Sequence, residues 1–159
     1  MIDVILAIKF VHVLVAALML GTWLCLVIFM LLAHRSGNPS VVALTSQFVV
    51  SVEMIVMAAA IVLQPISGIP LAFAIGLSPL GEFWIVLSVL LYAVILACWL
   101  AAVWIEIRIR GLTREASLNS RPLSAAYRRL FRIWCVLVFP ALAGMVAVFA
   151  LMIWQPRLD

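Results

Sequence analysis

The chain has 159 residues, of which 69% are hydrophobic and 10% are charged, and its formal net charge at pH 7 is +4. A soluble domain of this size has no use for so much apolar surface, whereas a membrane protein turns apolar side chains toward lipid as well as toward its core. The composition therefore predicts an integral membrane protein with no room for a soluble domain. The positive charge suits anionic lipid headgroups, and a nucleic-acid partner is not expected.

Four apolar segments are long enough to cross a bilayer, which takes about 20 residues per helix. The predicted helices cover about 5–32, 42–72, 83–108 and 129–154, with a cytoplasmic loop over 109–128. We therefore expect an all-α fold, an integral membrane four-helix bundle that forms a single transmembrane domain over residues 1–159. The second helix is expected to kink, or to become a short re-entrant or interfacial piece, at Pro65, Gly68 and Pro70.

The first predicted helix carries an ionisable side chain, His12, about seven residues inside its outer end and so roughly 10 Å deep. One interpretation is a packed histidine that hydrogen-bonds a neighbouring helix. The other is a metal ligand, above all to a haem iron between helices, because neutral imidazole is the commonest metal ligand and bundle cores hold cofactors. Lys9 is expected to extend to the outer headgroups, and beside a haem it would also pair with a propionate. The helix is expected to be retained, because "MID" lacks the basic start of a signal peptide.

Small residues on the first predicted helix, and cysteines on three of the four helices, give weaker signals. Ala17, Gly21 and Cys25 form a ridge at four-residue spacing, which suits close helix packing within the bundle or across a homodimer. Cys25, Cys98 and Cys135 lack the C-x-x-C spacing of a shared metal or redox site and are expected to be small buried hydrophobes.

The second predicted helix carries an acidic residue, Glu53, near the middle of its span, where a charge costs roughly 2.5–3.5 kcal/mol. Glu53 shares one helix face with Ser46, Met57 and Gln64, and this face is expected to point into the bundle. The functional interpretation is a proton relay or a contact to a bound ligand. The alternative is a protonated or Arg-paired glutamate with a structural role.

Arginines are concentrated in two of the three connections between the predicted helices. The first connection carries Arg35, and the loop 109–128 with its flanks carries Arg108, Arg110, Arg114, Arg121, Arg128, Arg129 and Arg132. Short loops rich in Lys and Arg stay on the cytoplasmic side. We therefore expect both termini on the periplasmic side of a bacterial inner membrane.

A second haem ligand must come from another helix. His34 lies 22 residues beyond His12 on the same helix, roughly 33 Å away, so a bis-His haem would need a second copy of the chain. When helix directions alternate, the residues that fall in the outer half, at the depth of His12, are Gln64, Tyr92, Met145 and Met152. Met145 with His12 would give a His/Met site of the kind that raises haem potential, and a five-coordinate iron is the other possibility.

Two resemblances accompany these patterns. "VWIEIRIR", "YRRLFRIW", Pro140 and "VFALMIWQP" resemble a small bacterial integral-membrane family known only as predicted membrane proteins of unknown function. The first helix, "IKFVHVLVAALMLGTW", is similar to the opening of HemJ-type protoporphyrinogen oxidases and copper-resistance D-like proteins, in which Lys-x-x-His-Val precedes a segment of small residues and Trp. HemJ-like proteins bind haem b, so this resemblance implies that His12 is an axial ligand.

The leading hypothesis is a membrane protein that binds haem b through His12 and serves electron transfer with a redox partner, or a haem-linked oxidation. Glu53 and Gln64 would shape its polar interior. One alternative is a non-catalytic accessory or assembly subunit without a cofactor. Another is a small dimeric transporter or copper-handling protein that uses Glu53 and the methionines.

Overall fold

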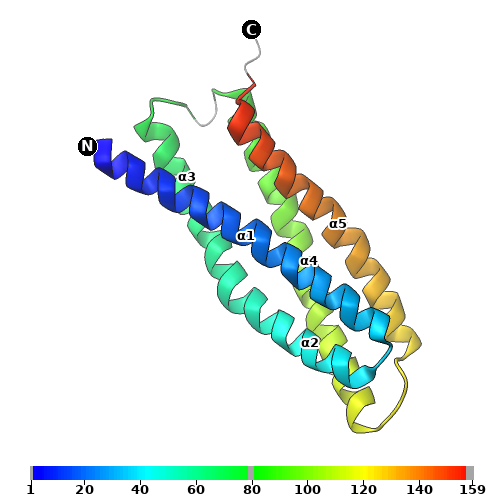
Figure 1. Cartoon of the computed structure of the whole chain (residues 1–159). Coiled ribbons are helices and arrows are strands. Elements are labelled where there is room, and N and C mark those ends of the chain that lie inside the picture. Colours follow the sequence, from blue (N-terminus) through cyan, green and yellow to red (C-terminus); the bar gives the residue numbers. More distant parts are fainter. Residues whose placement is uncertain (1, 79–80, 157–159) are drawn as a thin grey trace.

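The computed structural model describes residues 2–78 and 81–156, and in these ranges it contains helices alone. In chain order they are α1 (Ile2–Ser36), α2 (Pro39–Val52), the π-helical segment η1 (Glu53–Met57), α3 (Ala58–Ala74), α4 (Phe83–Leu118) and α5 (Ala125–Trp154). α2, η1 and α3 follow one another without interruption and form one span, Pro39–Ala74. The four spans alternate in direction, so both termini lie at one end of the bundle (Figure 1).

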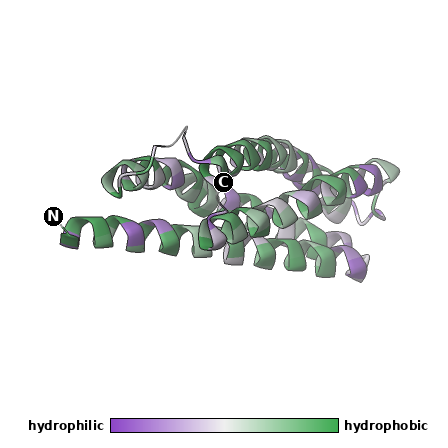
Figure 2. Cartoon of the chain, turned by 90° about the horizontal axis from the view of Figure 1, so that it is seen from above, coloured by the Kyte–Doolittle hydropathy of each residue, from purple (hydrophilic) through white to green (hydrophobic). Residues whose placement is uncertain are grey.

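The four spans are long and apolar enough to cross a membrane. Most of each helix is coloured hydrophobic in Figure 2, and large apolar side chains point outward along every span. Phe10, Leu44, Val94 and Val136 are between 61% and 72% exposed, an exterior that lipid solvates and water does not. The predicted all-α architecture with four transmembrane helices is confirmed.

Each helix buries one stripe of its surface. On α1 the buried residues recur every three or four positions, from His12 through Met19 and Trp23 to Met30, which is the period of one helix face. α4 packs against α5 and α2, and α1 packs against α3 and α2. The centre of the core contains fully buried Trp23 and Trp134.

The predicted loop 109–128 is much shorter in the structure, because α4 continues to Leu118 and α5 begins at Ala125. Ile109, Thr113 and Ala116 are buried and continue the inward face of α4, so packing extends the helix through a segment that is polar in sequence. Ser124 caps α5 by accepting a hydrogen bond from the backbone N–H of Tyr127, as N-cap serines do.

Pro65 and Pro70 lie inside α3, and the expected re-entrant or interfacial piece is absent from the described part of this span. Proline has no N–H, so Pro65 leaves the carbonyl of Ile61 without its usual helical partner. The hydroxyl of Tyr92 on α4 donates to that carbonyl over 2.6 Å. A neighbouring helix thus satisfies the group that the proline frees, as transmembrane bundles allow.

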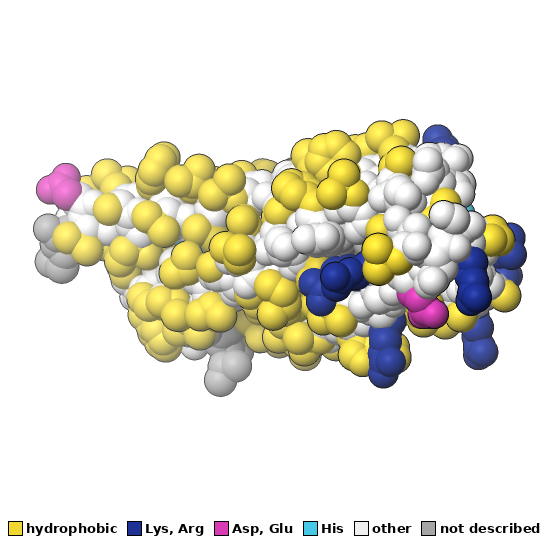
Figure 3. Space-filling model, turned by 90° about the horizontal axis from the view of Figure 1, so that it is seen from below, with side chains coloured by type: hydrophobic (Ala, Val, Ile, Leu, Met, Phe, Trp, Pro, Cys, Tyr) yellow, Lys and Arg dark blue, Asp and Glu magenta, His cyan; other side chains and the backbone are white. Residues whose placement is uncertain are grey.

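Arginine side chains gather at the end opposite the termini (Figure 3). We call this the Arg-rich end; it contains the turn between α1 and α2 and the connection 119–124 between α4 and α5. Arg35, Arg108, Arg114 and Arg121 are all exposed there. The cluster agrees with the arginine pattern in the sequence, and the side of the membrane it faces stays a prediction.

Candidate functional site

Two glutamates are buried together in the interior, and each is only 1% exposed. The indole N–H of Trp99 donates to Oε2 of Glu53 over 2.5 Å, and that of Trp134 donates to Oε1 of Glu106 over 2.7 Å. The two carboxyl groups lie within electrostatic reach of each other. Oε2 of Glu106 is buried and has no hydrogen-bond partner among the described residues, so this carboxyl pair has an oxygen free to hold a proton.

The backbone around Glu53 departs from the α-helix. The N–H of Ala58 bonds to the carbonyl of Glu53 five residues earlier, the pattern of a π-helix. Such single-turn segments inside α-helices occur frequently at functional sites. Both ends of η1 point inward, because Glu53 and Met57 are each 1% exposed, whereas Ile55 between them is 71% exposed.

Polar side chains follow one face of α4 at seven-residue intervals: Tyr92, Trp99, Glu106 and Thr113. We call this set the polar stripe. Seven residues are nearly two helical turns, so the four side chains stay on one face. Each hydrogen-bonds a different element: Tyr92 bonds α3, Trp99 bonds η1, Glu106 bonds α5, and Thr113 bonds α2.

The polar stripe approaches the surface at the Arg-rich end. Thr113 and Ser46 are both fully buried, and their hydroxyl oxygens lie 3.4 Å apart. Beyond them the hydroxyls of Ser40 and Ser117 form an exposed hydrogen bond of 2.9 Å. Hydroxyl groups therefore lie between the carboxyl pair and the Arg-rich end.

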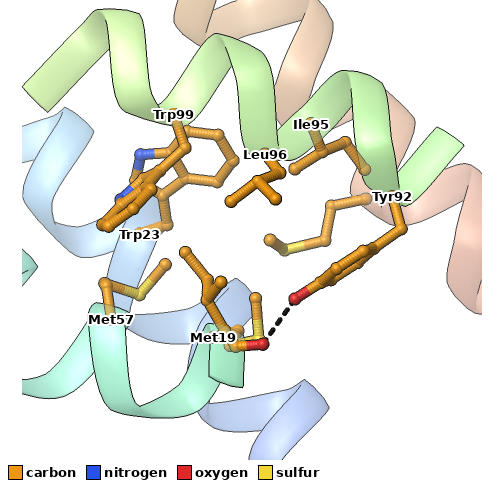
Figure 4. A pocket seen from close by; sticks show the side chains of 9 residues that line it. Met19, Trp23, Met57, Tyr92, Ile95, Leu96 and Trp99 are labelled. Atoms are coloured by element: carbon orange, nitrogen blue, oxygen red, sulfur yellow. Dashed lines mark hydrogen bonds between the residues drawn. The ribbon is translucent and has the colours of Figure 1, made fainter. Parts of the chain in front are cut away.

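A small cavity lies between the helices, beside Met57 of η1 and Trp99 of α4 (Figure 4). It measures about 10 Å³, room for about one water molecule. Its lining consists of Met19, Trp23, Met57, Ile61, Tyr92, Ile95, Leu96, Trp99 and Met145. Three thioether side chains from α1, η1 and α5 thus share one cavity.

His12 lies away from this cavity, where α1 crosses α3. Its Nδ1 lies 2.9 Å from the hydroxyl of Ser67, and the side-chain amide of Gln64 lies about 3.1 Å from the same nitrogen. Gly68 lies directly against the ring, since a Cβ there would lie 2.8 Å from Cε1 of His12. The contacts with α3 fit the interpretation of His12 as a packed residue. The ligand interpretation stays open, because Nε2 makes no hydrogen bond within the described residues.

The other predicted cofactor residues occupy different places. Gln64 is beside His12, whereas Met145 lines the central cavity together with Met19, which is seven residues and so roughly 10 Å deeper along α1 than His12. Met145 lines this cavity and His12 does not, and their pairing as two ligands of one iron stays a prediction. Lys9 is exposed, and its predicted contact with headgroups or a propionate stays a prediction.

The predicted polar face of the second span is confirmed for Ser46, Glu53 and Met57, which are all buried. Glu106 is not among the residues predicted from the sequence, because Arg108 and Arg110 follow it closely and give it the pattern of a charged helix end. The spacing of Tyr92 and Trp99, continued by seven residues, would have placed Glu106 on the inward face.

Small residues predicted to pack closely face outward. Ala17, Gly21 and Cys25 are exposed, and nothing lies within 4 Å of a Cβ built at Gly21. The ridge therefore does not serve packing within this chain. Cys98 and Cys135 are half-buried.

Histidine, cysteine, aspartate and glutamate form no group of three or more that could hold a metal ion in residues 2–78 and 81–156. Comparisons with curated proteins and with solved structures each found no match. A family model described as a predicted integral membrane protein matches residues 6–156, which include the carboxyl pair, three complete spans and α1 from residue 6 onward. The chain therefore belongs to the DUF2269 family of predicted integral membrane proteins.

Proposed function

We propose that this protein reversibly binds a proton inside the bilayer, at the carboxyl pair Glu53–Glu106, and exchanges it with the Arg-rich end along the polar stripe. The observation that carries the proposal is the burial of two carboxyl groups, each 1% exposed and each bound by one indole N–H. An ionisable group at membrane depth is a functional candidate by default. Two such groups close together cannot both be ionised cheaply, so we infer that they share a proton.

The partners of the two carboxyl groups support this role. Each carboxyl group accepts one indole N–H, which stabilises an ionised oxygen, and Oε2 of Glu106 has no acceptor or donor against it among the described residues. Thr113 lies two turns, roughly 10 Å, further along α4, so a proton held on that oxygen must cross this gap to reach its hydroxyl. The hydroxyls of Thr113, Ser46, Ser117 and Ser40 then lead toward the Arg-rich end, and by the positive-inside rule this end faces the cytoplasm.

Infrared difference spectroscopy of the protein in lipid nanodiscs tests the proposal. Stepping the pH should produce a carbonyl stretching band of a protonated carboxylic acid that appears and disappears reversibly. Glu53→Gln and Glu106→Gln should each remove or shift this band, because either change leaves a single carboxyl group with no partner to share its proton.

Glu115→Gln is the matched control, since it makes the same chemical change on the exposed side of the same helix as Glu106. It should leave the band unchanged. A spectrum that is identical in wild type, Glu53→Gln and Glu106→Gln would contradict proton binding at the pair.

Haem binding by His12 is the second candidate function, and one of the two tautomers of its imidazole leaves a nitrogen for a metal. When the Ser67 hydroxyl donates to the carbonyl of Leu63, over 2.8 Å, its oxygen accepts from Nδ1–H of His12. Nε2 then keeps its lone pair for a metal, the arrangement that ligating histidines use. The central cavity of about 10 Å³ does not fit a porphyrin, so this candidate requires a haem at the outer surface of α1 and α3, between two copies of the chain.

The visible absorption spectrum of the purified protein tests haem binding, before and after reduction with dithionite. A Soret band with reduced α and β bands in wild type, lost in His12→Ala and kept in His34→Ala, is the expected result for this candidate. A featureless spectrum from cells with ample haem would exclude it.

A further inference from the structure

We propose that the central cavity binds one soft monovalent cation, of the class to which Cu(I) belongs, through the thioether sulfurs of Met19, Met57 and Met145. The binding site itself is independent of the proposed proton chemistry. Only the proton release described below rests on that proposed function.

The three methionines come from three separate elements, α1, η1 and α5, and are 4%, 1% and 6% exposed. Figure 4 shows Met19 and Met57 reaching into the cavity beneath the aromatic rings of α4. Thioether sulfur is a soft ligand that selects Cu(I) and disfavours hard cations such as Mg²⁺ and Ca²⁺, which take oxygen. The donor set of the cavity therefore defines the class of ion.

The size and polarity of the cavity also favour a single small cation. Its volume of about 10 Å³ accommodates one small sphere and excludes an organic substrate. A buried water needs two to four polar partners. The hydroxyl of Tyr92 and the indole N–H of Trp99 face this region, but they already donate to the Ile61 carbonyl and to Glu53. A cation that bonds to sulfur needs none of these hydrogen bonds.

A buried monovalent cation also requires a compensating charge. Glu53 supplies it, because Trp99, which lines the cavity, is hydrogen-bonded to its carboxylate. Glu53 and Met57 are the first and last residues of η1, so the π segment carries one ligand and the counter-charge together.

Binding of the cation is therefore coupled to loss of the proton shared by Glu53 and Glu106. The ion enters with one positive charge, one proton leaves along the polar stripe to the Arg-rich end, and the net charge of the interior is unchanged. The metal keeps its oxidation state, and no electron is transferred.

The experiment uses the full chain in detergent with Cys25, Cys98 and Cys135 replaced by alanine, because thiolates also bind soft metals. Ag(I) is the probe, as a redox-stable ion of the same class, and it is titrated against a competing chelator. The fluorescence of Trp23 and Trp99, which line the cavity, reports binding. One ion should bind each chain.

Two of the three methionines are replaced by leucine, which has a similar volume, and another methionine, outside the cavity, serves as the control. Met57→Leu and Met145→Leu should weaken Ag(I) binding by about tenfold or more, as loss of a metal-site group does. Met54→Leu lies on the same π segment but its side chain is 54% exposed, and it should leave the affinity unchanged. Equal losses in Met54→Leu and Met57→Leu would overturn the site.

X-ray absorption of the Cu(I)-loaded, cysteine-free protein tests the site with all three methionines in place, so the result does not depend on how the methionine variants fold. Sulfur neighbours alone in the nearest shell are expected. Nitrogen or oxygen neighbours, or no saturable binding of either ion, would overturn the proposal.

A pH indicator in weak buffer separates the metal site from the proton chemistry. We expect one proton released for each Ag(I) bound, and none in Glu53→Gln. Saturable Ag(I) binding without proton release would leave the metal site standing and overturn its coupling to the carboxyl pair.

Discussion

Gly68 on α3 and His12 on α1 pack directly against each other. A Cβ at position 68 would lie 2.8 Å from Cε1 of His12 and 3.4 Å from Nδ1, closer than side chains normally approach. The ring cannot easily move aside, because Ser67 holds Nδ1. Glycine at this position therefore permits the contact between α1 and α3.

Gly68→Ala should lower the free energy of unfolding in detergent by about 1–3 kcal/mol, the usual cost of overpacking. Gly111→Ala is the control, since nothing lies within 4 Å of its Cβ. It should instead raise stability by up to about 1 kcal/mol, because alanine is the better helix former. Equal effects of the two changes would contradict the close contact at His12.

The sequence indicated some site residues and concealed others. Glu53 and His12 stand out because each is an isolated polar residue in an apolar run, and the structure buries both. Glu106 does not stand out, because nearby arginines obscure it. The three methionines of the cavity lie on separate spans, and methionine is so common in apolar cores that one chain alone gives no signal that they converge.

At the level of helices, composition predicts the four spans but not their ends. The segment 109–118 is too polar to be recognised as membrane helix, yet it continues α4 because Ile109, Thr113 and Ala116 pack inward. The prolines of α3 suggested a kink or a re-entrant or interfacial piece, and α3 continues as a helix through both of them. Tyr92 removes much of that cost by bonding the carbonyl of Ile61, a contact between helices that local sequence cannot reveal.

The π segment could not be predicted for a related reason. Its five residues, "EMIVM", have no composition that distinguishes them from the helix on either side. Glu53 and Met57 both pack toward the interior, but residues four apart share one face of an ordinary α-helix as well, so their positions do not signal the wider turn.

For the whole molecule, helix length exceeds membrane thickness. α4 has 36 residues, so it measures about 54 Å at 1.5 Å per residue, against a hydrocarbon core of about 30 Å. The Arg-rich end therefore extends beyond the lipid on one side. The distribution of arginines predicts that this side is the cytoplasm.

Cysteine labelling tests this orientation. In the cysteine-free protein, Ser120→Cys places a thiol at the Arg-rich end, and Ser78→Cys places one at the end with the termini; both serines are exposed. A membrane-impermeant maleimide should label Ser120→Cys in inside-out vesicles and Ser78→Cys in intact spheroplasts. Labelling with the opposite pattern would reverse the predicted orientation.

The seven-residue spacing of the polar stripe constrains the number of residues in α4 more strongly than it constrains which residues occupy its other positions. One residue inserted or deleted between Tyr92 and Thr113 would turn everything beyond it by about 100° about the helix axis, and polar groups would face lipid. Many outward positions of the same helix, such as Val94 and Leu100, contact only the hydrocarbon, where one apolar side chain replaces another at little cost. Variants of this protein should therefore tolerate many substitutions on the exterior of α4 and almost no change in its residue count.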